Sequence, residues 1–280
     1  MNLMQLIKLV LDDAYAGIKA KNDAEKDALI KKELGALSAC YATLTNKAIK
    51  PIDYSDPLKR FAYIYKYTVA HADYIMQVIS GEKVLRDLLS QKKIEVACLG
   101  GGPGSDLLGI LKYMINAGIK ATQLTCYIFD KERAWGDSWS DVAIQLNAPF
   151  QLNPVFQQMD VTDQKVWGSY NKYLRSDLFT LSFFLSEVWK IKDQADPFFN
   201  HCLANMKKGA LVLFIDNNAE TFTKWFDELA KNNNLKPILV HSAKIAFSNN
   251  EEKKDLGVYF EKFGWPKRES DAAIRIMQKV

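Results

Sequence analysis

The first ninety residues repeat apolar positions at helical spacing. Apolar side chains recur every three or four residues in three stretches, Met4–Ile18, Ala28–Leu44 and Leu58–Leu89. A turn-rich segment, Lys50–Pro57, separates the second stretch from the third. We expect Ser55 or Asp56 to cap the following helix, with Pro57 at its first position. The pattern therefore predicts an all-helical N-terminal part.

After Gln91 the pattern changes to short apolar runs that alternate with amphipathic stretches. This alternation is typical of a mostly parallel sheet with crossover helices. The predicted strands are Glu95–Leu99, Leu124–Phe129, Pro154–Gln158, Phe179–Phe184, Ala210–Ile215, Ile238–Ala246 and Ala273–Gln278. No clear helix separates the last two strands, so we expect an antiparallel hairpin with a long, charged and aromatic connection, Phe247–Asp271. We predict an α/β fold with a seven-stranded Rossmann-like sheet, its last strand antiparallel, at residues 91–280, and a helical subdomain at residues 1–90.

The strongest local signal is a strand that runs into a glycine loop and then into a helix. Residues 99–106 read Leu-Gly-Gly-Gly-Pro-Gly-Ser-Asp, with glycines at Gly100, Gly101, Gly102 and Gly104. Glycine lets a ligand approach the main chain, and the helix start offers free N–H groups. The spacing fits G-x-G-x-G, whereas GxxxxGK(S/T) lacks its lysine and GxGxxG lacks its third glycine. A plain tight turn needs only one or two glycines, so we predict a small-molecule cradle.

Composition and charge restrict the possible functions. The chain has 280 residues, 48% hydrophobic and 25% charged, which suits a folded protein, and its longest apolar runs are far shorter than a membrane helix requires. The net charge is +4, and only six of the 37 basic residues are arginine, so composition indicates no dedicated nucleic-acid surface.

The cysteines and the N-terminal segment point to an intracellular protein without a structural metal. Cys40, Cys98, Cys126 and Cys202 are scattered singly, with no CxxC pair and no histidine at metal-ligand spacing. The N-terminal stretch is amphipathic and lacks a cleavage pattern, so we do not interpret it as a signal peptide. We expect a cytoplasmic protein, and a nuclear location is also compatible with the sequence.

Four motifs in order resemble those of class I S-adenosylmethionine-dependent methyltransferases, over residues 91–280. They are the glycine loop, Tyr-Ile-Phe-Asp ending at Asp130, Gln-Met-Asp-Val with Asp160 and Val161, and the lysine-glycine turn of Met206–Leu213. The resemblance implies the Rossmann-like methyltransferase sheet and S-adenosylmethionine as cofactor. It also implies that Asp130 accepts hydrogen bonds from the ribose hydroxyls, that Asp160 meets the adenine amine, and that Val161 packs on the base.

Other interpretations of these residues stay open at this stage. Asp130 and Asp160 also suit turn or helix-capping positions after a strand. A carboxylate after the second strand binds a ribose in a dinucleotide site as well, so only the glycine spacing and Asp160 favour the methyl donor. Many family members carry an acid where this chain has Cys98, so the contact to the amino group of the cofactor has to come from elsewhere.

Candidate catalytic residues lie after the fourth strand and in the helical part. The segment Phe179–Trp189 lacks the Asn/Asp-Pro-Pro-Tyr/Phe tetrad, and it has a fainter likeness to large-subunit ribosomal RNA uridine-N3 methyltransferases. Glu187 is a candidate general base or, equally, a helix cap. In the helical part, Tyr67 and His71 share a face with Tyr63 and Tyr74, which is typical of a packed face and also suits an acceptor pocket.

The resulting functional hypothesis is a methyltransferase whose acceptor is unidentified, an RNA base being favoured over a small molecule or a protein. One alternative is a catalytically inactive, methyltransferase-like module that senses the donor or binds another protein. A second alternative is an NAD-type oxidoreductase.

Overall fold

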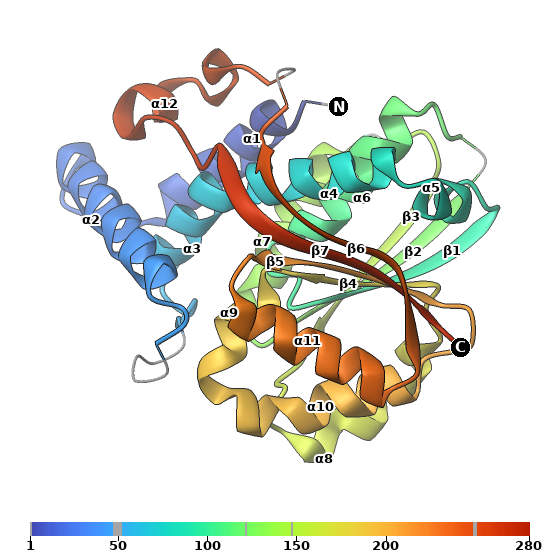
Figure 1. The fold of residues 1–280 in the computed structure, drawn as a ribbon. Coiled ribbons are helices and arrows are strands. Elements are labelled where there is room, and N and C mark those ends of the chain that lie inside the picture. Colours follow the sequence, from blue (N-terminus) through green and yellow to red (C-terminus); the bar gives the residue numbers. More distant parts are fainter. Residues whose placement is uncertain (1, 47–51, 121, 147, 249–250) are drawn as a thin grey trace.

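Seven strands form one mixed sheet in the computed structural model, which describes residues 2–46, 52–120, 122–146, 148–248 and 251–280. The strands are β1 (Lys93–Leu99), β2 (Gln123–Asp130), β3 (Gln151–Gln158), β4 (Leu178–Ser182), β5 (Leu211–Asn217), β6 (Leu235–Ala246) and β7 (Glu269–Lys279). Their order is β3-β2-β1-β4-β5-β7-β6, and β1 to β5 run parallel. β7 lies antiparallel between β5 and β6 (Figure 1). The predicted fold class is confirmed, and each predicted strand overlaps an observed one.

The central strands are apolar because helices cover both faces of the sheet. On one face lie α6 (Ser105–Asn116) and α7 (Ala134–Gln145) with helices of the N-terminal part. The other face is covered by α8 (Gln164–Trp167), η2 (Gly168–Arg175), α10 (Lys192–Ala204) and α11 (Glu220–Asn232) (Figure 1). Each layer buries its own cluster of apolar side chains against the sheet.

The N-terminal part is helical, as predicted. Its elements are α1 (Leu3–Gly17), α2 (Asp23–Ala42), α3 (Pro57–Tyr63), η1 (Ile64–Thr68), α4 (Val69–Gly81) and α5 (Lys83–Leu89). Asp56 is the N-cap of α3 and accepts a hydrogen bond from the Leu58 N–H at 2.9 Å, with Pro57 at the first position. The third predicted stretch is not one regular helix, because η1 is a π-helical segment. Such segments are rare and occur frequently at functional sites.

The helical part and the sheet share one hydrophobic core. Apolar side chains of α1 and α4, such as Ile7 and Ile75, belong to the same buried cluster as Leu108 of α6 and Val96 of β1. Gly109 of α6 lies so close to α4 that a Cβ there would come within 2.4 Å of the Ala72 carbonyl oxygen. The division at residue 90 stays a prediction: residues 90–93 between α5 and β1 are exposed, while Leu89 and Ile94 on either side belong to this core.

A buried ionic network joins segments that are far apart in the sequence. The Lys112 ammonium lies 3.0 Å from Asp73 Oδ1 and 2.8 Å from Glu251 Oε1, and all three side chains are buried. Glu251 also accepts hydrogen bonds from the N–H groups of Leu3 and Met4 at the start of α1. The network therefore fastens the connection between β6 and β7 to α1, α4 and α6.

Two predicted boundaries were wrong. The fourth strand ends at Ser182, because Phe183 adopts a left-handed conformation (φ 54°) and α9 (Phe184–Val188) begins directly after it, followed by η3 (Trp189–Ile191). The predicted loop between the last two strands contains η4 (Lys253–Leu256) and α12 (Val258–Phe263), and β7 already starts at Glu269. No helix in the described ranges has the length and apolar character needed to cross a membrane.

Candidate functional site

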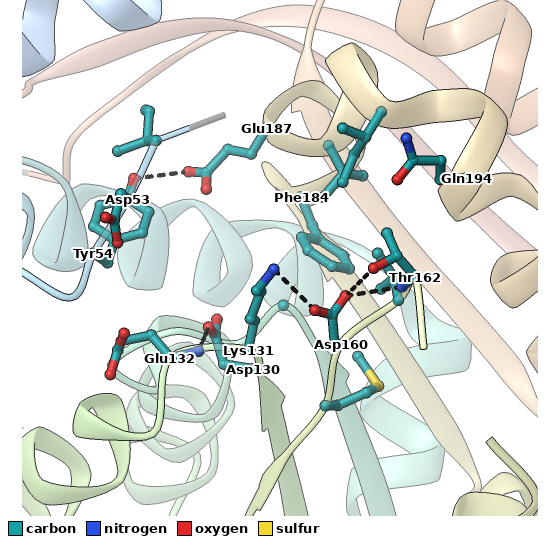
Figure 2. Close-up of a pocket in the computed structure, with 16 residues that line it drawn as sticks. Asp53, Tyr54, Asp130, Lys131, Glu132, Asp160, Thr162, Phe184, Glu187 and Gln194 are labelled. Atoms are coloured by element: carbon teal, nitrogen blue, oxygen red, sulfur yellow. Dashed lines mark hydrogen bonds and ion pairs between the residues drawn. The ribbon is translucent and has the colours of Figure 1, made fainter. Parts of the chain in front are cut away.

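A cavity of about 550 Å³ opens at the carboxyl ends of the parallel strands. It is lined by residues that follow β1, β2, β3 and β4, together with a segment of the helical part around Tyr54 (Figure 2). Ligands of open parallel sheets collect at this edge. The volume lies within the range of small-molecule and cofactor sites.

The glycine loop contributes Gly100 to the cavity lining, whereas Gly101, Gly102 and Gly104 do not line the cavity. Gly100, Gly102 and Gly104 all have positive φ angles, which favour glycine. Gly100 lines the cavity, and a Cβ there would come within 2.2 Å of the Phe184 ring. A Cβ at Gly104 would meet the Trp139 ring at 2.5 Å, whereas one at Gly102 would meet nothing closer than 4.0 Å. Of the four loop glycines, Gly100 is the one in the cavity lining, and the Phe184 ring occupies the space where its side chain would be.

Asp130 ends β2 and points into the cavity. Its Oδ2 accepts a hydrogen bond from the Gly102 N–H at 3.0 Å, and its Oδ1 accepts one from the Glu132 N–H at 3.0 Å. Burial raises the pKa of Asp130 to about 6, although the backbone donors lower it. Each oxygen keeps a lone pair for a further donor. The turn role and the ligand role that the sequence left open are thus compatible in one residue.

Asp160 and Val161 follow β3 and line the same cavity. Asp160 Oδ1 accepts hydrogen bonds from the Thr162 N–H at 2.9 Å and the Thr162 hydroxyl at 2.7 Å, and Oδ2 lies 2.8 Å from the Lys131 ammonium. Burial alone would raise the pKa of Asp160, but the donors from Lys131 and Thr162 hold it below its ordinary value. Val161 and Met159 give this side of the cavity an apolar wall.

Glu187 lies in α9 and lines the cavity on the side opposite to Asp130 and Asp160 (Figure 2). Its Oε1 accepts hydrogen bonds from the Tyr41 hydroxyl and, at 3.3 Å, from the Tyr54 hydroxyl. Burial raises the pKa of Glu187 to about 8; the Tyr41 hydroxyl lowers it, and the nearby carboxylates of Asp130 and Asp216 raise it. The carboxyl group is therefore suited to exchange a proton near neutral pH.

Tyr67 and His71, the other predicted catalytic residues, do not line the cavity. Both are buried, Tyr67 in η1 and His71 in α4. The His71 ring stacks on Phe183 at a centroid distance of 3.9 Å, and burial holds the pKa of His71 well below its ordinary value. The Tyr67 ring packs on Tyr41 at 4.5 Å. The predicted packed face is present, and a catalytic role for these two residues stays a prediction.

Sequence reasoning missed several residues of the site. Tyr41 and Tyr54 were not singled out, although the clustering of tyrosines in the helical part was a usable signal. Asp106, in the first turn of α6, is a buried acid that accepts a hydrogen bond from the Thr180 hydroxyl. Cys98 lies inside the sheet with its sulfur 3.6 Å from that of Cys126, away from the cavity lining.

Negative charge dominates the cavity. Among the described residues that line it, the carboxyl groups are those of Asp53, Asp130, Glu132, Asp160 and Glu187. The one ammonium group among the same residues belongs to Lys131, which is paired with Asp160. No group of three or more His, Cys, Asp or Glu side chains in the described part of the chain is arranged to hold a metal ion.

No protein-family model and no curated protein matches this chain. Among solved structures, it is similar to a Pyrococcus horikoshii protein proposed to be an RNA methyltransferase (14% identity, 87% of this chain and 96% of that chain covered, TM-score 0.46). It is also similar to a SAM-dependent methyltransferase from Methanosarcina mazei (9% identity, 71% of this chain and 98% of that chain covered, TM-score 0.45). A third similar structure is the CurJ carbon methyltransferase (10% identity, 91% of this chain and 67% of that chain covered, TM-score 0.49). Likenesses at this level assign neither a cofactor nor an acceptor to this chain.

Proposed function

We propose that this protein is an S-adenosylmethionine-dependent methyltransferase whose acceptor gives up a proton to Glu187. The observation that carries the proposal is the charge of the cavity. Five acidic side chains line the cavity against one paired ammonium group, and of the five only Glu187, with its pKa of about 8, is mostly neutral at pH 7. This excess of acidic groups suits a donor that carries a sulfonium, whereas it repels the two phosphates of a dinucleotide. The same observation speaks against an NAD-type oxidoreductase.

The residues of the cavity fit the donor. In this proposal Asp130 accepts hydrogen bonds from both ribose hydroxyls, since each of its oxygens has a lone pair beyond its backbone donor. Gly100 offers its main chain without a side chain in the way, and Met159 and Val161 offer an apolar surface to the adenine. Asp160 has a carboxylate oxygen for the adenine amine, shared with Lys131. When bound, the cofactor supplies an electrophilic methyl group.

Glu187 carries the proton chemistry of the proposal. The transferred methyl needs an acceptor with a free lone pair, so a nucleophile that is protonated at neutral pH first has to lose a proton. A base whose pKa is about 8 is close to the operating pH and therefore efficient. In this proposal, the remaining rate acceleration comes from alignment of the reactants and from exclusion of water from the cavity. We propose an RNA base with a ring N–H as the acceptor, on the sequence resemblance alone.

Donor binding tests the first part of the proposal. Calorimetric titration is expected to give binding of S-adenosylmethionine and S-adenosylhomocysteine and none of NAD. D130A should weaken binding by about 1.5–3 kcal/mol, because the ribose hydroxyls lose a charged acceptor, and D130N should keep part of the affinity. D137A, which removes an exposed carboxylate of α7, is the matched control and should bind normally. NAD binding, or an unchanged D130A titration, would remove the proposal.

Methyl transfer tests the second part. Protein incubated with methyl-labelled donor and either total RNA, a peptide pool or small amines should label the RNA fraction, and nuclease digestion should release the label. Label in the peptide or amine fraction would support methyltransferase activity but would show that the acceptor is not RNA. No label in any fraction, with normal donor binding, would favour the inactive donor-sensing module.

A further inference from the structure

Two phenol hydroxyls from the helical part converge on one oxygen of Glu187. Tyr41 lies near the end of α2, and Tyr54 lies in the segment that leads into α3. Both hydroxyls contact Glu187 Oε1, and they lie 3.0 Å from each other. The two tyrosines are 146 and 133 residues away from Glu187 in the sequence. This contact thus exists only because the helical part folds against the carboxyl ends of the strands.

Aromatic packing holds both phenols in place. The Tyr41 ring packs on Tyr67 at 4.5 Å, and the Tyr54 ring packs on Tyr63 and on Trp135 at 5.3 Å each. Rings that are packed on several sides lose little further freedom when their hydroxyls bind an acceptor. The positions of the two hydroxyl oxygens are therefore fixed by the fold before any ligand enters.

We propose that Tyr41 and Tyr54 are positioning residues that hold the Glu187 carboxyl group in one orientation and stabilise its ionised form. The inference rests on the proposed role of Glu187 as the base. Because both phenols bind Oε1, they leave Oε2 to take the proton: the O–H bond forms at Oε2 while the bond from hydrogen to the nucleophilic atom of the acceptor breaks, and the electron pair of that bond stays on the acceptor.

Because of the charges around Glu187, the two hydroxyls have a measurable effect on its pKa. Burial and the carboxylates of Asp130 and Asp216 oppose ionisation of Glu187, and both phenols favour it by donating to the carboxylate. The neighbouring phenols of Tyr63 and Tyr67 face the same region, and Glu187 raises the pKa of both; Tyr63 is in addition hydrogen-bonded to Tyr41. Removal of either donor should therefore make Glu187 harder to ionise.

A carboxyl NMR titration measures this effect without an acceptor. The 280-residue chain is labelled with ¹³C at glutamate side-chain carboxyls, and the Glu187 signal is assigned by its loss in E187Q. We expect a wild-type midpoint near pH 8. In Y41F and in Y54F the midpoint should move to higher pH by about one to two units, because one hydrogen bond to a charged acceptor is lost. Y65F, which removes a buried phenol hydroxyl of η1 that donates to the carbonyl oxygens of Tyr259 and Gly264, is the matched control and should titrate like wild type.

Two outcomes would overturn the proposal. One is a wild-type midpoint in the ordinary glutamate range, and the other is a midpoint that Y41F and Y54F both leave unchanged while their melting temperatures fall, which is the result of packing alone. Calorimetry with S-adenosylmethionine on the same variants separates this inference from the proposed function. Failure of the function appears as absent donor binding in wild type, whereas failure of the inference leaves donor binding intact.

Discussion

At the scale of single residues, Gly100 links backbone conformation to the shape of the cavity. Its φ is +67°, and a Cβ there would lie 2.2 Å from the Phe184 ring. G100A should therefore add two costs, a left-handed backbone for alanine and the displacement of Phe184. We expect a loss of about 2–4 kcal/mol in the free energy of unfolding and weakened binding of S-adenosylmethionine. Urea denaturation and calorimetry measure the two effects.

A matched control at Gly118 distinguishes the cost of the backbone conformation from the cost of displacing Phe184. Gly118 has almost the same backbone conformation as Gly100, but no atom lies near the position of its Cβ. Its φ is +69°, and nothing lies within 4 Å of a Cβ built on it. G118A should lose only about 1–2 kcal/mol, from the backbone alone, and should bind the donor normally. Equal losses in the two variants would show that Phe184 gives way without cost and that the cavity does not depend on Gly100.

Glu187 also makes stability depend on pH. Its pKa is about 8 in the folded protein and has the ordinary value of 4.5 when unfolded, so the unfolded state loses the proton first. This contribution to stability is complete below about pH 4.5 and is lost as the pH rises towards 8. E187Q has no such proton, so its stability relative to wild type should improve over this range by about 1–3 kcal/mol, a figure reduced for solvent screening. Urea titrations at pH 5 and pH 8 compare the two proteins, and a constant difference would contradict the assignment.

At the scale of elements, strand positions are predictable from sequence because burial on both faces selects continuous apolar runs. The end of β4 was not predictable from the sequence. Phe183 belongs to a continuous apolar run, and yet its backbone adopts the left-handed conformation. Only Gly, Asn and Asp signal that conformation in a sequence. Its ring stacks on His71 of α4, a contact that depends on how the helical part meets the sheet. A bulky residue in this conformation is typical of strained functional sites.

The residues of the candidate site likewise fall into those that could be predicted from the sequence and those that could not. Asp130 and Asp160 were predictable, because residues that follow neighbouring parallel strands meet at one edge of the sheet, and β2 pairs with β3 up to Asp130 and Gln158. Tyr41 and Tyr54 were not, because their position depends on the path of α2 and α3 over that edge. Helical periodicity identifies a buried face without showing what it is buried against.

At the scale of the whole molecule, the Lys112 network connects the two ends of the chain. Lys112 of α6 holds Asp73 of α4 and Glu251 of the connection before β7, and Glu251 in turn binds the first N–H groups of α1. Asp73 also accepts hydrogen bonds from the N–H and hydroxyl of Ser248. Because its members come from four segments, α1, α4, α6 and the connection between β6 and β7, the network becomes complete only when these distant parts of the chain have folded together.

K112M should therefore destabilise the entire protein and not one helix. Methionine fills most of the space of the lysine stem but leaves two buried carboxylates without their cation, a situation that costs about 3–5 kcal/mol. K83M breaks the exposed pair between Lys83 and Asp87, whose side chains are 79% and 62% exposed, and should cost less than about 1 kcal/mol. Urea denaturation followed both by circular dichroism and by tryptophan fluorescence should give one transition for K112M, shifted to lower urea. A small loss equal to that of K83M, or a separate early transition of the helical part, would show that the network does not join the helical part and the sheet into one cooperative unit.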